Sequence, residues 1–270
     1  ALSSAASDVY KRQDEELIKH KKSAIKKVNN VLEVFLNSHN PKHKKKADLI
    51  SYWLESYSQY LLNEEKFDYT TIPRYKRGDI ISVNFGFNVG SEHGGLHYAI
   101  VLDNDNRQSS PVITVIPLSS GKEVDTYERD VYLGNELYEK LNAKYNKLNA
   151  QINEDLNNLC KTISVLAKSA DTLAEDSEAN LQKDVEELLA ELRVRVETLN
   201  REKAMLKTYE KKLLKLKEGS IALMEQITTI SKMRIYEPKN SSDLLYDIKF
   251  SDGAMDKINV QLKKLFVYSK

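Results

Sequence analysis

The chain contains few residues that would cross-link it or interrupt its helices. Cys160 is the only cysteine in 270 residues, which excludes an intrachain disulfide and a cysteine-rich zinc site and is typical of a reducing compartment. Nine glycines and five prolines, beside 30% charged residues, indicate long exposed helices. The sequence also lacks an apolar run of about 18 residues and a basic N-terminal region followed by an apolar core. We therefore predict no membrane span and no secretion signal, and we expect the protein in the cytoplasm.

The overall charge is almost balanced, with 41 Lys and Arg residues against 40 Asp and Glu residues. A surface that binds a polyanion would therefore have to be local. Apolar residues make up 41% of the chain, which is enough for at least one packed core and excludes a disordered chain.

Residues 1–13 are set apart from the fold, because Asp8–Gln13 resembles the translation of a transposase adapter used in library preparation. A genuine flexible tail is the alternative, and under the adapter interpretation the native start is missing. Residues 14–66 carry apolar side chains at helical spacing and are predicted to form an N-terminal arm of two amphipathic helices. Between them, Asn37–Lys46 holds a helix-stopping proline and a run of lysines. This segment predicts a solvated turn, with phosphate contact as the alternative.

Short β-rich segments follow, separated by Gly, Asn and Ser. The predicted strands are residues 79–85, 97–102, 112–118 and 129–133, then 220–223, 227–231 and 245–250. No helix-length segment separates the first strands, which favours a small barrel or sandwich over βαβ units. An amphipathic helix is predicted over residues 252–266, with Ser251 as its N-cap. Its predicted buried face consists of Met255, Ile258, Leu262 and Leu265.

A long segment without glycine or proline, residues 135–218, interrupts these strands. Its apolar residues recur at steps of three and four with Lys and Glu between them, which is typical of a coiled coil. A single helix of this length would extend ~120 Å and separate its ends. If the strands on either side share one domain, the segment must be an antiparallel hairpin, turning near Asp176-Ser177. The domain is then encoded in two pieces, residues 73–134 and 219–270.

Several motifs, in order, resemble PemK/MazF toxins. The motifs are Arg77-Gly78-Asp79-Ile80-Ile81, Gly90-Ser91-Glu92-His93-Gly94-Gly95, Ala99–Asp105, Ser110-Pro111, Leu118-Ser119 and Leu223–Arg234. The resemblance covers about residues 73–133 and 219–266, and the two helical regions depart from the compact family pattern. It implies an α+β fold with a small SH3-like barrel of the PemK/MazF/CcdB type. It also implies a homodimer whose activity is metal-independent cleavage of mRNA. An antitoxin would neutralise that activity, and operator DNA would be bound through the toxin–antitoxin complex.

The resemblance also points to particular residues. Cleavage without a metal uses the 2′-hydroxyl of the RNA as nucleophile, so the protein must move protons and stabilise the phosphorane. His97 stands where compact members have a catalytic arginine, and Ser119 where they often have a catalytic threonine. A histidine can transfer protons near neutral pH but lacks the permanent charge and forked donors of arginine.

Other residues would bind the substrate. Ser91 and Glu92 lie on the loop expected to flank the groove, and Arg77 and Lys76 are the nearest cations for phosphate contact. Each residue also has a plain structural interpretation: Arg77 as a solvated charge, Glu92 as a surface carboxylate, Ser119 as a strand end. No set of His, Cys, Asp and Glu has metal-binding spacing, so we expect neither a metal nor another cofactor.

Three functions stay open from the sequence. The first is a sequence-selective endoribonuclease, a hydrolase that halts translation. The second is a binding module for nucleic acid or protein that has lost nuclease activity with the arginine. The third is an interaction scaffold whose hairpin is the binding surface. The N-terminal helices could in addition cover the groove as a regulatory segment.

Overall fold

The computed structural model describes residues 2–172, 179–217 and 219–267. The chain divides into two compact units, residues 1–66 with 86–89 and residues 67–85 with 90–270. None of the helices in the described ranges combines the length and the apolar character that crossing a bilayer requires.

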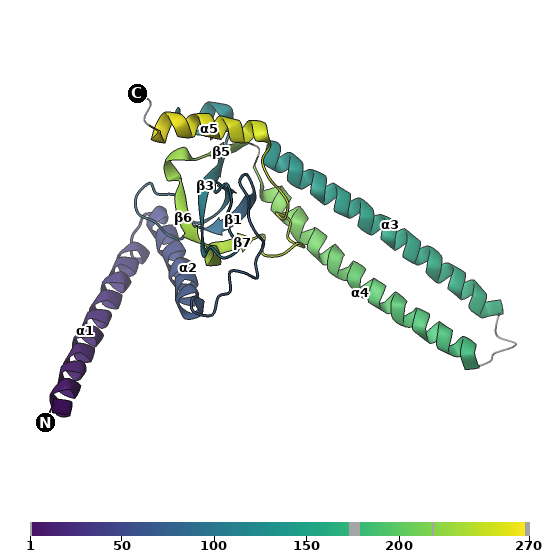
Figure 1. The fold of residues 1–270 in the computed structure, drawn as a ribbon, viewed down its shortest axis with the longest axis horizontal. Coiled ribbons are helices and arrows are strands. Elements are labelled where there is room, and N and C mark those ends of the chain that lie inside the picture. Colours follow the sequence, from purple (N-terminus) through teal and green to yellow (C-terminus); the bar gives the residue numbers. More distant parts are fainter. Residues whose placement is uncertain (1, 173–178, 218, 268–270) are drawn as a thin grey trace. The chain divides into compact units, whose positions relative to one another are not determined.

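The first unit contains two helices, α1 (Leu2–Leu36) and α2 (Pro41–Asn63) (Figure 1). Asn40 caps α2 by accepting a hydrogen bond of 3.0 Å from the backbone of Lys42, and Pro41 opens the helix. The predicted break between two helices is therefore confirmed. Helix α1 begins at Leu2 rather than near Asp14, because no glycine or proline interrupts residues 1–36.

A short piece of the loop after β1, residues 86–89, belongs to the first unit. The Trp53 ring of α2 lies against Gly86, whose φ of +81° is in the left-handed region. A Cβ at this position would come within 2.7 Å of the Trp53 ring. The close approach of the indole therefore requires glycine at residue 86.

The second unit is built on an antiparallel sheet. Its strands are β1 (Ile80–Asn84), β2 (Leu96–Val101), β3 (Val112–Ser120), β4 (Val131–Tyr132), β5 (Ser220–Ala222), β6 (Thr228–Ser231) and β7 (Ile235–Glu237). They are ordered β4-β5-β3-β2-β1-β7, and β6 also pairs with β3. Strands from before and after the helical segment thus share one sheet, and the α+β class is confirmed. The predicted closed barrel is not confirmed. Within the described residues, the two outer strands of the sheet, β7 and β4, do not pair with each other.

The sheet is buried on both faces because neighbouring residues of its central strands are both apolar. Ile80, Ile100 and Ile116 belong to one cluster, the helix-side core, which also includes residues of α5 (Asp252–Phe266) and the base of the helical segment. Ile81 and Val115 belong to a second cluster, the strand-side core. Side chains alternate across a strand, so each central strand contributes to both cores.

The C-terminal helix α5 matches its predicted bounds. Ser251 caps it by accepting a hydrogen bond of 3.3 Å from the Ala254 amide, and Ile258 is fully buried. The strand predicted at residues 245–250 is reduced to a single antiparallel bridge, between Lys249 and Asp79. Residues 245–247 form turns, with Asp247 at a φ of 59°, and the segment adds Leu245 and Phe250 to the helix-side core. Residues 248–250 bond beside the start of β1, and further along the same strand Ser82 and Val83 pair with β7, which the sequence did not predict.

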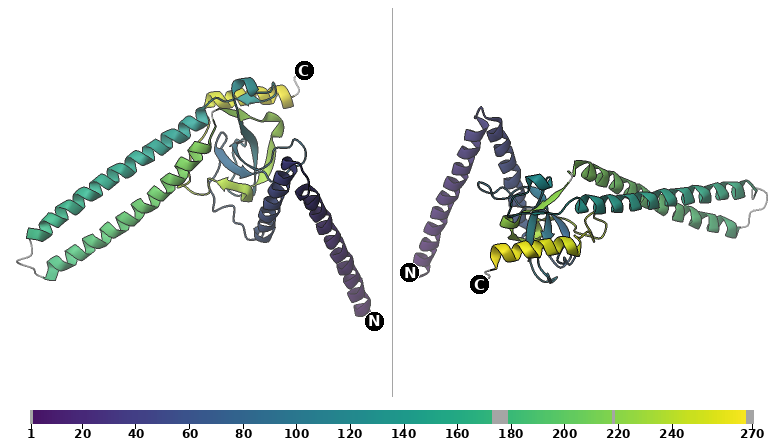
Figure 2. Two further views of the ribbon diagram at one scale, coloured as in Figure 1. Left: turned by 180° about the vertical axis from the view of Figure 1, so that it is seen from behind. Right: turned by 90° about the horizontal axis from the view of Figure 1, so that it is seen from above.

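The inserted segment forms two long helices, α3 (Glu136–Thr172) and α4 (Ala179–Lys215), which lie side by side (Figure 2). Their antiparallel pairing is fixed by a small core of Ile152, Leu199 and Leu206 and by an ion pair of 2.9 Å between Arg195 and Asp155. The turn predicted near Asp176-Ser177 lies outside the described residues, and coiled-coil packing stays a prediction. The ends of the segment meet, since the Gly219 amide donates to Asn135 Oδ1 at 2.8 Å.

Candidate functional site

The main candidate site is an opening between β2 and β3. The two strands pair at Ala99–Val101 and Val115–Pro117. Beyond Pro117, strand β3 keeps a partner only on its opposite edge, where it pairs with β5. Residues 96–98 of β2 then pair only with β1. The strands therefore part, and a cavity of about 280 Å³ lies at the opening.

His97 and Ser119 both line this cavity. Continuing the register of Ala99 and Pro117 by two residues places them at facing positions, on the same face of β2 and β3. The structure therefore brings together the two residues predicted to be catalytic. Their sequence separation of more than twenty residues is closed by the turn from β2 to β3.

His97 is exposed as a residue, but the His93 ring lies against it. Its centroid lies 4.2 Å from that of the His93 ring. Loss of hydration lowers the pKa of His97, and a hydrogen bond with the backbone of Gly94 opposes the shift. The imidazole is thus mainly neutral at pH 7, which suits a proton acceptor but not a permanent phosphate ligand.

His93 is held more tightly than His97. Its ring meets the Phe85 ring edge-on at 5.4 Å, and its amide donates to Gln226 Oε1 at 3.1 Å. Burial first, and His97 second, lower the pKa of His93 to about 4. Gln226 also donates to the Ser91 carbonyl oxygen at 3.4 Å, so the turn Met224–Gln226 holds the loop that carries Ser91 and the exposed Glu92.

Arg77 and Lys76 do not line the cavity of His97. The Arg77 guanidinium donates to the Leu102 carbonyl oxygen and to Asn259 Oδ1, and so joins the end of β2 to α5. Lys76 lines a different cavity, together with Asp79. The reason is register: these residues precede β1, whereas His97 pairs near its far end, opposite Val83. Residues 97 and 102 of a strand lie roughly 17 Å apart.

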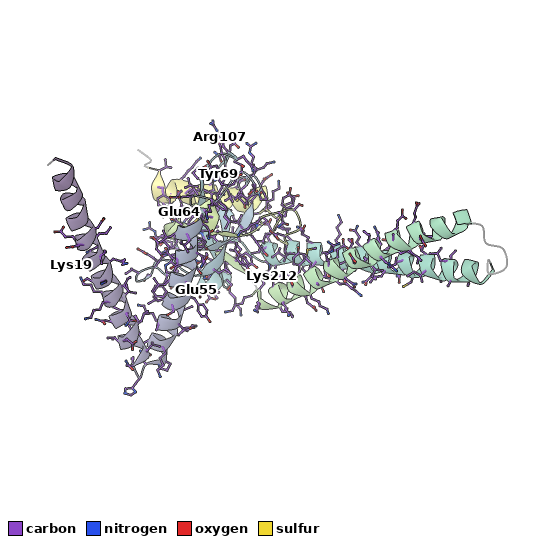
Figure 3. All side chains as sticks on the ribbon, turned by 90° about the horizontal axis from the view of Figure 1, so that it is seen from below. Lys19, Glu55, Glu64, Tyr69, Arg107 and Lys212 are labelled. Atoms are coloured by element: carbon purple, nitrogen blue, oxygen red, sulfur yellow. The ribbon has the colours of Figure 1, made fainter. Side chains whose placement is uncertain are left out.

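The sequence did not predict several residues of the cavity. Three lysines at the end of α4 and just beyond it, with two residues of β7, complete the lining: Lys212, Lys215, Lys217, Tyr236 and Glu237. Lys212, at the end of α4 next to the sheet (Figure 3), forms an ion pair with Glu237. In the sequence, these lysines are visible only as a cluster before Gly219. That they line the cavity follows only from the placement of α4 beside the sheet.

No group of three or more His, Cys, Asp or Glu residues in the described ranges could hold a metal ion.

Residues 76–192 match the family model described as PemK-like, MazF-like toxin of type II toxin-antitoxin system. The match begins before β1 and ends within α4. Residues 219–266, which also resemble the family in sequence, lie outside it. A search of curated proteins found no match.

Proposed function

We propose that this chain, which contains a PemK/MazF-like toxin domain in residues 76–192, is the endoribonuclease of a type II toxin–antitoxin system. The proposal depends mainly on one observation, the joint lining of one open cavity by His97 and Ser119. The reaction would cleave mRNA without a metal, with the 2′-hydroxyl of the substrate as nucleophile.

The two residues would have separate roles. A mainly neutral His97 can accept the proton of the attacking 2′-hydroxyl, because partial loss of hydration lowers its pKa. The 2′-oxygen would bond to phosphorus as the bond to the 5′-oxygen breaks, and water would protonate the leaving 5′-oxygen. The Ser119 hydroxyl can donate a hydrogen bond to a phosphate oxygen as charge builds on the phosphorane. Ser91 and Glu92, on the loop held by Gln226, would contact the nucleotides beside the cleaved bond.

The partners follow from the family. Toxins of type II systems have an antitoxin partner, and in general an RNA target. For this chain we propose a homodimer in the cytoplasm whose activity is blocked by its own antitoxin. Binding of operator DNA would occur through that complex rather than through the toxin alone.

A second function is favoured by one specific observation. His97 occupies the family's arginine position, and its lowered pKa leaves little positive charge there at neutral pH. The domain could therefore bind nucleic acid or protein without cleaving RNA. The two functions differ in whether a covalent bond of the RNA is broken.

The decisive experiment uses the full chain and a long, structurally varied RNA in EDTA, with cut sites mapped by primer extension. His97→Ala and Ser119→Ala test the cavity, and His39→Ala, an exposed histidine of the first unit, is the matched control. We expect site-specific cuts by the wild type and by the control, and their loss in His97→Ala. A folded wild-type protein that makes no cuts would refute the nuclease and support the binding module.

A further inference from the structure

We propose that the inserted helical hairpin takes part in the site directly: Lys215 and Lys217 bind the phosphate backbone of the RNA at the cavity of His97 and Ser119. This inference rests on the proposed nucleic-acid function. It assigns to the insertion the positive charge that compact members of the family obtain from arginine.

The charge of the cavity supports this assignment. Among its lining residues are three lysines and one carboxylate, Glu237. Glu237 pairs with Lys212, which leaves two positive charges, on Lys215 and Lys217. Both side chains are exposed, and within the described part of the chain no salt bridge engages them. Two unneutralised ammonium groups beside a cavity form a local site for a polyanion on a chain of balanced charge.

No other predicted cation reaches the same place. The lowered pKa of His97 leaves its ring mainly neutral. The Arg77 guanidinium is engaged by Leu102 and Asn259 near the opposite end of β2. Among the described residues, the positive side chains that line the cavity are therefore the lysines at the end of α4 and just beyond it.

The end of α4 is firmly placed against the sheet. Tyr209 of α4 and Leu141 of α3 are buried in the helix-side core. Lys144 Nζ donates to the Tyr246 carbonyl oxygen at 2.7 Å, and Glu136 accepts from the Ser251 amide at 2.5 Å. These contacts fix the base of the hairpin, so the last turn of α4, which carries Lys215, is positioned before any substrate arrives. Lys217 lies between this turn and Gly219, whose amide is bonded to Asn135. A pre-positioned cation loses less freedom on binding than one on a mobile loop.

Lysines at a helix C-terminus also interact favourably with the helix dipole. Stabilisation of the helix would not depend on RNA. Measurements of RNA binding and of its salt dependence therefore distinguish a stabilising role of these lysines from a phosphate-binding role. Removing one lysine–phosphate contact with a single strand lowers the slope of log K against log salt by about 0.7.

The experiment measures binding of a fluorescent 2′-O-methyl RNA, which cannot be cleaved by 2′-hydroxyl attack, at several salt concentrations. Lys215→Gln, Lys217→Gln and the double variant are compared with Lys211→Gln, an exposed lysine of α4 outside the cavity lining. We expect the double variant to lower the slope by about 1.4. Lys211→Gln should leave it unchanged, and circular dichroism should show equal helix content throughout.

The outcomes separate the two proposals. A double variant that binds with the wild-type slope overturns the lysine site, whether or not the wild type cuts RNA in EDTA. A lysine-dependent slope with no cutting supports the site and refutes the nuclease. A folded wild type that neither binds nor cuts RNA overturns both.

Discussion

Gly219, where the inserted segment returns to the sheet, offers a sharp test of the packing described above. Its φ is +79°, and a Cβ built on it would lie 2.0 Å from the Gly121 carbonyl oxygen. Gly134, at the other end of the insertion, has a φ of +68° but no atom within 4 Å of the same position. Replacing each glycine with alanine therefore separates backbone strain from a steric clash.

The expected magnitudes differ. An alanine in the left-handed region costs about 1–2 kcal/mol, partly offset by about 0.4–1 kcal/mol from a stiffer unfolded chain. We therefore expect Gly134→Ala to destabilise by about 1 kcal/mol. In Gly219→Ala the clash with Gly121 adds overpacking of about 1–3 kcal/mol. Moving the two backbones apart also weakens the 3.3 Å bond from the Gly121 amide to the Gly219 carbonyl oxygen. That adds about 1 kcal/mol, for a total of about 3–5 kcal/mol.

The assay must report on the sheet. The single tryptophan, Trp53, belongs to the first unit, so its fluorescence would follow the wrong part of the chain. Hydrogen exchange of the amides of Leu133 and Ser220, which bond to Ser220 and Gly134 backbone oxygens, follows the free energy of opening at the junction. Equal losses in the two variants would refute the clash and, with it, the close approach of β3 and β5.

Three further predictions follow from the side chains of the second unit. His97 has a lowered pKa and is proposed to accept a proton. We therefore expect kcat/KM to rise with pH and to reach its plateau below pH 6.5, the ordinary pKa of histidine. A kcat/KM that falls as the pH rises toward 6.5 would contradict this role. For His93, the unfolded chain binds more protons between pH 6.5 and about 4, so stability falls as the pH falls through this window. After allowing for the solvent that still reaches the ring, the loss is about 1–2 kcal/mol, and it should disappear from denaturation curves of His93→Gln. For Tyr209, whose hydroxyl donates to the Ser242 carbonyl oxygen, Tyr209→Phe should cost about 1 kcal/mol in exchange at the hairpin base, and an unchanged rate would show the bond to be unimportant.

Local patterns predicted most of the secondary structure. Alternating apolar residues gave the early strands, and the Ser251 cap gave the start of α5, because these signals depend on near neighbours in the sequence. The strand expected beside β1 late in the sequence was not predicted correctly. Residues 245–250 carry apolar side chains that fill the helix-side core from a turn and a single β-bridge, and a short apolar run does not by itself distinguish a strand from such a segment.

The candidate site was predicted in part. His97 and Ser119 were found through the family resemblance, and the register between β2 and β3 then placed them at one cavity. Arg77 was proposed for phosphate because of its charge and its nearness in sequence to β1. The structure instead engages it with Asn259 of α5, which no sequence pattern indicated.

The sequence alone determined the helical insertion between two β-rich pieces, the absence of an intrachain disulfide and the family resemblance, because composition and spacing are properties of the chain itself. Only the tertiary structure decided which charges share the cavity. Lys215 and His97 are more than a hundred residues apart in sequence. They line one cavity because β2 stops pairing with β3 before Ser119, and because β5, which follows the hairpin, pairs with the other edge of β3 there. Contacts of this kind depend on which strands pair and on how a helix is anchored, and these are set by long-range packing rather than by the local sequence.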